Sequence, residues 1–125
     1  MFKALIIEDE ILAARRLERL IKGYDASIEL IARLPSVKST VNWLSHNPPP
    51  DLAFMDIHLE DGLSLAIFEQ LDIACPVILT TAFDKYPLHA LSALNVCLVG
   101  YLPKPIQPEE LSAALNKFKA HFLLL

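Results

Sequence analysis

Residues 4–10 read ALIIEDE, an apolar run that ends abruptly in the acids Glu8, Asp9 and Glu10. Like charges side by side repel one another, so this cluster is unfavourable unless a cation or another partner offsets it. Runs that are apolar on consecutive residues are typical of strands buried on both faces of a sheet. Four more such runs follow along the chain: ELIARL (29–34), LAFM (52–55), VILTT (77–81) and VCLVGYL (96–102).

Segments with the apolar spacing of helices separate these runs. The three apolar stripes are Leu17, Leu20, Ile21 and Tyr24; Leu63, Ala66, Ile67 and Leu71; and Leu111, Ala114, Leu115, Phe118 and Phe122. Pro108, followed by Glu109 and Glu110, suits the first turn of the last helix. Residues 36–46 form a weaker helix candidate that starts at Ser36. Strands that alternate with helices predict a (βα)5 domain of the α/β class, with a parallel sheet between two helical layers.

Length and composition exclude several classes of protein. A chain of 125 residues favours one domain, and a hydrophobic content of 54% argues against disorder. No apolar run approaches the roughly 18 residues of a membrane span, and no leader-like segment opens the chain. We therefore expect a cytoplasmic protein without membrane contact. The net charge of −4 offers no basic surface for nucleic acid. Cys75 and Cys97 adjoin or lie in apolar runs and are predicted to be free thiols rather than a disulfide or metal pair.

The carboxyl ends of the strands carry the polar residues that matter for function. In an open parallel sheet, ligands bind outside these ends. Glu8 and Asp9 follow the first run, Asp56 follows the third, Thr81 ends the fourth and Lys104 follows the fifth. Carboxylates hold hard cations such as Mg²⁺, which often bridges to phosphate oxygens. A lysine and a hydroxyl nearby would hold the other oxygens of a phosphoryl group.

Asp56 is the best placed nucleophile among these carboxylates. It stands alone at the end of its run, and an aspartate in such a site can form an acyl phosphate. Glu8 and Asp9 come as a pair that suits a metal ion. A cation between the acids would offset their mutual repulsion.

Four motifs carry a resemblance to a known family. IIEDE (6–10), FMDIHLEDG (54–62), TTAF (80–83) and GYLPKPI (100–106), in this order, resemble the receiver domain of bacterial two-component response regulators. The stretches IIEDEILAARRLERLI and TTAFDKY look most like receivers of LytTR-type transcription regulators. The resemblance implies a flavodoxin-like three-layer sandwich with sheet order 2-1-3-4-5. It also implies that residues 1–125 are a single receiver domain, whose effector domain, expected to bind DNA, is absent from this chain.

The resemblance assigns roles in the metal site. Asp56 matches the phosphoacceptor, which also binds Mg²⁺. Glu8 and Asp9 match the acidic pair, with Asp9 as the direct ligand. His58 matches the position that binds the metal through its backbone carbonyl.

The resemblance also assigns the residues around the phosphoryl group. Lys104 matches the lysine that contacts it, and Thr81 matches the switch hydroxyl. Tyr101 matches the aromatic residue that changes rotamer on activation. The Lys104–Pro105 peptide bond is expected to be cis. Pro103 and a longer 84–103 segment depart from the family pattern.

These roles imply a phosphorylation-controlled switch and not a turnover enzyme. A sensor histidine kinase would donate the phosphoryl group, and the output would be control of transcription. The surface of residues 84–123 is predicted to form a homodimer. One alternative is a degenerate receiver that acts as an unphosphorylated interaction module. Another is an aspartyl-phosphate phosphatase of the haloacid dehalogenase type, which needs a second acid where this chain has His58.

Overall fold

The structure is a computed structural model that describes residues 2–82 and 96–123. Its elements in chain order are β1 (Phe2–Ile7), α1 (Ile11–Tyr24), β2 (Ile28–Leu34), α2 (Val37–His46), β3 (Leu52–Asp56), β4 (His58–Leu59), β5 (Gly62–Leu63), α3 (Leu65–Gln70), β6 (Val77–Thr81), β7 (Leu98–Pro103) and α4 (Pro108–Leu123). Residues 84–95, which form the first part of the predicted dimer surface 84–123, lie outside the described residues. No helix in the described part of the chain combines the length and apolar character needed to cross a membrane.

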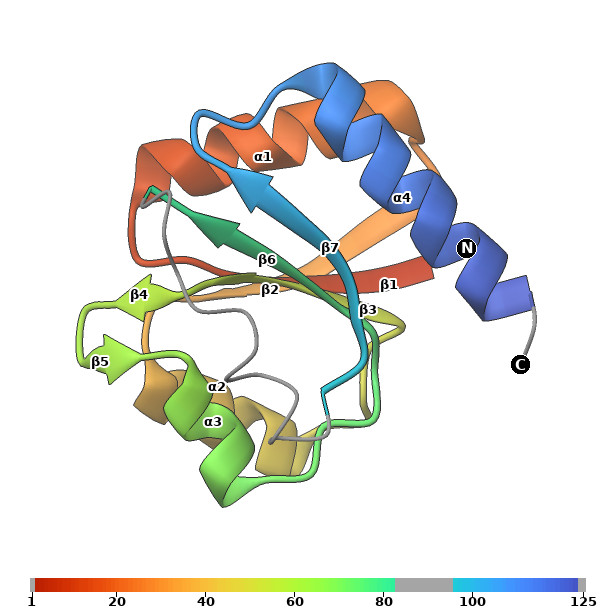
Figure 1. The fold of residues 1–125 in the computed structure, drawn as a ribbon. Coiled ribbons are helices and arrows are strands. Elements are labelled where there is room, and N and C mark those ends of the chain that lie inside the picture. Colours follow the sequence, from red (N-terminus) through yellow and green to blue (C-terminus); the bar gives the residue numbers. More distant parts are fainter. Residues whose placement is uncertain (1, 83–95, 124–125) are drawn as a thin grey trace.

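Five strands form one parallel sheet in the order β2-β1-β3-β6-β7. Helices α1 and α4 cover one face of this sheet, and α2 and α3 cover the other (Figure 1). This arrangement confirms the predicted flavodoxin-like sandwich, because β6 and β7 are the fourth and fifth strands of the sheet. All five carboxyl ends therefore point to the same edge.

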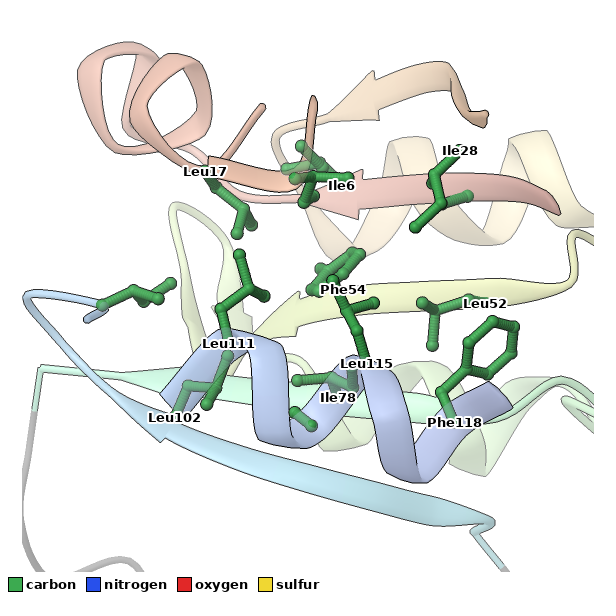
Figure 2. Packing of buried hydrophobic residues seen from close by; sticks show 14 of the residues in the cluster. Ile6, Leu17, Ile28, Leu52, Phe54, Ile78, Leu102, Leu111, Leu115 and Phe118 are labelled. Atoms are coloured by element: carbon green, nitrogen blue, oxygen red, sulfur yellow. The ribbon is translucent and has the colours of Figure 1, made fainter. Parts of the chain in front are cut away.

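Burial explains why the apolar runs became strands. Every residue of the central strands β3 and β6 is buried, as expected for strands covered by helices on both faces. The edge strands β2 and β7 are only partly buried. Between α1, α4 and the sheet lies the larger hydrophobic cluster, where Leu115 and Phe118 of α4 point toward Leu52 and Phe54 of β3 (Figure 2).

Helices α2 and α4 begin and end close to the expected residues, whereas α1 contains the predicted stripe but begins at Ile11, before Leu17. Leu17 and Ile21 of α1 are buried. Helix α2 starts directly after Ser36, whose side chain accepts a hydrogen bond from the backbone N–H of Ser39 in a capping box. Helix α4 begins at Pro108, as predicted.

The segment after Asp56 differs from the prediction. Leu63 does not begin a helix but belongs to β5, where it pairs with His58 of β4 in a short antiparallel hairpin. Gly62 closes the turn with a φ of 139°, a conformation that favours glycine. Helix α3 begins only at Leu65, and Leu71 is its C-cap.

The cysteines are free, as predicted. Cys75 packs in the cluster on the α2 and α3 face, whereas Cys97 packs against the cluster on the opposite face. Burial raises the pKa of the Cys75 thiol to about 11. Cys75 is therefore an inert core residue.

Gly100 allows α4 to approach β7 closely. A Cβ atom at this position would lie 2.9 Å from the Cβ of Ala114 and 3.4 Å from Ile78. Gly100→Ala should therefore lower the free energy of unfolding by about 1–3 kcal/mol through overpacking. Urea denaturation measures this change. Gly23→Ala is the control, because a Cβ there meets nothing within 4 Å and should stabilise the helix by up to about 1 kcal/mol.

Candidate functional site

The carboxyl edge of the sheet brings the predicted acids together. Glu8 follows β1, and Asp56 is the last residue of β3. One carboxylate oxygen from each of Glu8, Asp9 and Asp56 lies within 4.8 Å of the other two. Glu8 and Asp56 are buried, whereas Asp9 is more accessible.

Lys104 binds both buried acids. Its Nζ donates a hydrogen bond to Oδ2 of Asp56 at 2.9 Å and a second one to Oε1 of Glu8. The side chains are 17% exposed for Lys104, 6% for Glu8 and 9% for Asp56, so water screens these ion pairs weakly. One ammonium thus partly neutralises two carboxylates.

The pKa values of Glu8 and Lys104 are both shifted by their surroundings. Burial raises the pKa of Glu8 to about 7; the nearby Asp56 adds to the shift, and the hydrogen bond from Lys104 opposes it. Burial alone would lower the pKa of Lys104, but its hydrogen bonds to the two acids outweigh this effect and raise it. Glu8 is therefore the group that changes protonation near neutral pH.

Backbone contacts fix Glu8 in place. Its N–H donates to the carbonyl of Leu34 at 3.0 Å, and its own carbonyl accepts from Nη1 of Arg33 at 2.9 Å. The backbone N–H of Glu10 donates to Oε2 of Glu8 at 3.2 Å. Arg33 was not among the predicted site residues. It lies inside β2 and not at the carboxyl end of a strand run, where the sequence analysis placed the site.

Asp56 is held by the residues that follow it. The N–H of Ile57 donates to the carbonyl of Thr80 at 3.0 Å, which continues the pairing of β3 with β6. The N–H of His58 donates to Oδ1 of Asp56 at 3.3 Å. His58 is exposed and begins the hairpin. Its hydrogen bond to Asp56 places its backbone next to the phosphoacceptor candidate.

The remaining predicted residues lie on the neighbouring strands. Thr81 is buried at the end of β6, and its carbonyl accepts a hydrogen bond from the N–H of Lys104 at 2.7 Å. Tyr101 is half-buried in β7, opposite Leu79. Pro103 pairs with Thr81 on the edge strand and does not displace Lys104 from the site. The Lys104–Pro105 peptide is cis, as the resemblance implied.

The donor set fits a hard divalent cation. Three carboxylates offer only oxygen ligands, and Mg²⁺ binds through one or two carboxylates while it keeps several waters. A cation would also offset the repulsion from Asp56, which adds to the effect of burial on the pKa of Glu8. Among the described residues, no other group of three acidic, histidine or cysteine side chains clusters in this way.

A cavity of about 430 Å³ opens beside the acids, between α1 and the loop after β7. Its lining includes the charged side chains of Glu8 and Lys104 and apolar residues such as Leu17 and Ile106. Leu12 at its rim is 75% exposed. The site is thus open to a partner and has an apolar flank.

Comparison with known proteins agrees with this geometry. Residues 4–116 match the response regulator receiver domain family. The sensory transduction protein LytT of Bacillus anthracis is 32% identical over 122 residues, which are 95% of this chain and 48% of that protein. The transcriptional regulatory protein BtsR of Salmonella typhi is 31% identical, with 95% and 48% covered. The positive alginate biosynthesis regulatory protein of Pseudomonas aeruginosa is 35% identical, with 90% and 45% covered.

Solved structures show the same fold. The response regulatory domain of protein mrkE from Klebsiella pneumoniae has a TM-score of 0.81 at 24% identity, and 98% of this chain and 99% of that one are covered. The chain spans about half the length of the curated relatives it matches. The sheet order, the acidic edge and these similarities agree: this chain belongs to the response regulator receiver domain family, with LytT-type regulators among its relatives.

Proposed function

We propose that this receiver domain takes up a phosphoryl group on Asp56 with the help of Mg²⁺ and so controls an output domain. The observation that carries the proposal is the contact of Lys104 with Asp56, inside a cluster of three carboxylates. A buried aspartate next to an ammonium and a cation site has the groups that phosphoryl transfer needs. The domain assists one transfer and its hydrolysis, and it does not turn over a free substrate.

Each residue has a role in the transfer. A carboxylate oxygen of Asp56 attacks phosphorus, the bond from phosphorus to the donor nitrogen breaks, and the electron pair leaves with the imidazole of the phosphohistidine. Lys104 stabilises the charge on the phosphoryl oxygens. Glu8, Asp9, Asp56 and the backbone carbonyl of His58 would hold Mg²⁺, which supplies charge neutralisation for the phosphoryl oxygens when bound.

The partner that donates the phosphoryl group is a sensor histidine kinase. Ile11 and Leu12, 51% and 75% exposed, lie at the start of α1, and Leu12 lines the cavity beside the acids. Exposed apolar side chains next to a reaction centre favour a protein donor, whose phosphohistidine must reach Asp56. A cytoplasmic location follows from such a partner.

The switch and the output complete the proposal. Thr81 and Tyr101 would follow the phosphoryl group and shift a pre-existing equilibrium between two surfaces. The LytT-type relatives include transcriptional regulators, so we infer control of transcription, with DNA bound only through an effector domain outside these residues. Homodimerisation through residues 84–123 remains a prediction. Light scattering with and without beryllofluoride tests it.

Intact mass spectrometry tests the central proposal. The domain is incubated with Mg²⁺ and acetyl phosphate, beside an Asp56→Asn variant. We expect the gain of one phosphoryl group that needs both Mg²⁺ and Asp56. A folded wild-type domain that gains nothing at saturating Mg²⁺ would instead favour the degenerate receiver, an unphosphorylated interaction module.

Mg²⁺ affinity should depend on pH through Glu8. Because the pKa of Glu8 is about 7 in the metal-free fold, protons compete with the cation below neutrality. The apparent affinity should fall about tenfold from pH 8 to pH 6. Calorimetric titration at both pH values measures this change, and Glu8→Gln should remove it. An equal pH dependence in that variant would contradict the assignment.

The same pKa predicts how the metal-free stability depends on pH. The carboxyl of Glu8 has a higher pKa in the folded chain than its ordinary value of 4.5, so the folded state binds its proton more tightly. This contribution to stability is complete below pH 4.5 and is lost as the pH rises toward about 7. Mg²⁺ should offset the loss above neutrality.

A further inference from the structure

The hairpin of β4 and β5 is tied to α2 by one side chain. Asp61, in the turn of the hairpin, accepts a hydrogen bond from the N–H of Val37 at 2.7 Å through Oδ1. It accepts another from the N–H of Lys38 at 3.1 Å through Oδ2. These contacts link residues more than twenty positions apart in the chain. The hydrogen bonds hold the pKa of Asp61 below its usual range, so the carboxylate is charged.

The start of α2 is complete only with this carboxylate. Ser36 satisfies the N–H of Ser39 with its side chain and the N–H of Thr40 with its carbonyl. The N–H groups of Val37 and Lys38, the first two of the helix, donate instead to the carboxylate of Asp61. A negative charge at a helix start is also favoured by the helix dipole. The hairpin is therefore held by a helix end whose donors are otherwise unpaired.

The other end of the hairpin leads directly to the metal site. The N–H of His58 donates to Asp56, and the N–H of Ser64 donates to the carbonyl of Ile57 at 2.8 Å. The hairpin between them contains only two pairs of residues that face each other across the strands, and Gly62 has a positive φ. So short a ladder is marginal on its own. Its position must come from contacts outside it.

The helix that holds the hairpin is itself joined to the site. Helix α2 follows β2, whose last residue, Leu34, accepts the N–H of Glu8, and Arg33 donates to the Glu8 carbonyl. Helix α2 is thus linked to both acids of the site through neighbouring segments of the chain. The end of β2, which precedes α2, bonds the backbone of Glu8, and the hairpin that Asp61 ties to α2 bonds Asp56 through the N–H of His58.

We propose that Asp61 is a positioning residue that holds the backbone of His58 beside Asp56 and so strengthens binding of the divalent cation. This inference rests on the proposed function, because the cation is the one that phosphoryl transfer requires. Partners outside the first ligand shell of a metal commonly change its affinity tenfold or more. We expect Asp61→Ala to weaken binding by about tenfold, at the low end of that range. Asp61→Asn keeps one oxygen acceptor and should lie in between.

Mn²⁺ serves as the probe, because its free ion is counted directly by electron paramagnetic resonance. Glu60→Gln is the matched control: it removes the same charge from the same turn, and Glu60 is exposed. Its affinity for Mn²⁺ should stay within about twofold of the wild type, because a solvent-exposed charge is well screened. Amide exchange of Val37 and Lys38 without metal reports the tie itself. It should accelerate in Asp61→Ala and not in Glu60→Gln.

Two outcomes overturn the inference alone. In the first, Asp61→Ala exposes the two amides but binds Mn²⁺ like the wild type, which means that Asp61 only caps α2. In the second, Asp61→Ala and Glu60→Gln weaken binding equally, which means that only charge matters. A wild-type domain that binds no Mn²⁺ and gains no phosphoryl group overturns the proposed function together with this inference.

Discussion

Lys104→Met is expected to slow phosphoryl transfer to Asp56 by about 100- to 1,000-fold, the range seen when one donor to a developing anion is removed. Lys104 donates to Oδ2 of Asp56 at 2.9 Å, so its ammonium lies where the phosphoryl oxygens would arrive. Methionine keeps much of the chain length and removes the charge. Mass spectrometry after timed incubation with Mg²⁺ and acetyl phosphate gives the rate.

Lys117→Met is the control for this substitution. Lys117 is an exposed lysine of α4 on a different part of the surface, so its loss should leave the rate within about twofold. Equal rates for Lys104→Met and the wild type, with both proteins folded, would remove Lys104 from the proposed mechanism.

The same substitution should destabilise the metal-free domain. Without the ammonium, Glu8 and Asp56 stay buried with no cation between them, and breaking such a buried network costs about 3–5 kcal/mol. Glu8 can take up a proton and lose its charge, so the destabilisation should lie near the lower end of this range, above all at low pH. Mg²⁺ should restore part of the stability. Urea denaturation with and without Mg²⁺ separates this effect from the effect on the rate.

The sheet could be predicted from sequence because its signal is repeated in every strand. Buried strands need consecutive apolar residues, and each of the five runs ended within a residue or two of the strand observed. The acids could be placed together for the same reason, since parallel strands bring their carboxyl ends to one edge. Neither step needs knowledge of side-chain contacts.

The hairpin after Asp56 shows where this reasoning fails. Leu63 fitted a helical stripe, yet it lies in β5 and is 43% exposed. The sequence Asp61–Gly62 favours a tight turn, which is incompatible with a helix that starts at Leu63. The turn forms, and the helix begins only at Leu65. The ties from Asp61 to α2 and from Arg33 to Glu8 join residues distant in sequence. Periodicity carries no record of such contacts.

Phe118→Ala is expected to lower the free energy of unfolding by about 3–5 kcal/mol, the usual cost of removing a buried aromatic ring. Phe118 is fully buried between α4 and the sheet (Figure 2). Its ring centroid lies 5.0 Å from that of Phe2 in an edge-to-face contact. Domains of this size are stable by only about 5–15 kcal/mol, so the change is a large part of the total.

Phe122→Ala is the matched control, because Phe122 contacts the same Phe2 ring at 4.9 Å but is 36% exposed. Its loss should cost clearly less, since part of the ring is already in water. Trp43 in α2 reports from the opposite face of the sheet, so a common midpoint for its fluorescence and for circular dichroism shows that both layers unfold together. Equal costs for the two variants would mean that α4 is not docked by Phe118. If Phe118→Ala left the midpoint of the Trp43 fluorescence transition unchanged, the two faces of the sheet would not unfold as one cooperative unit.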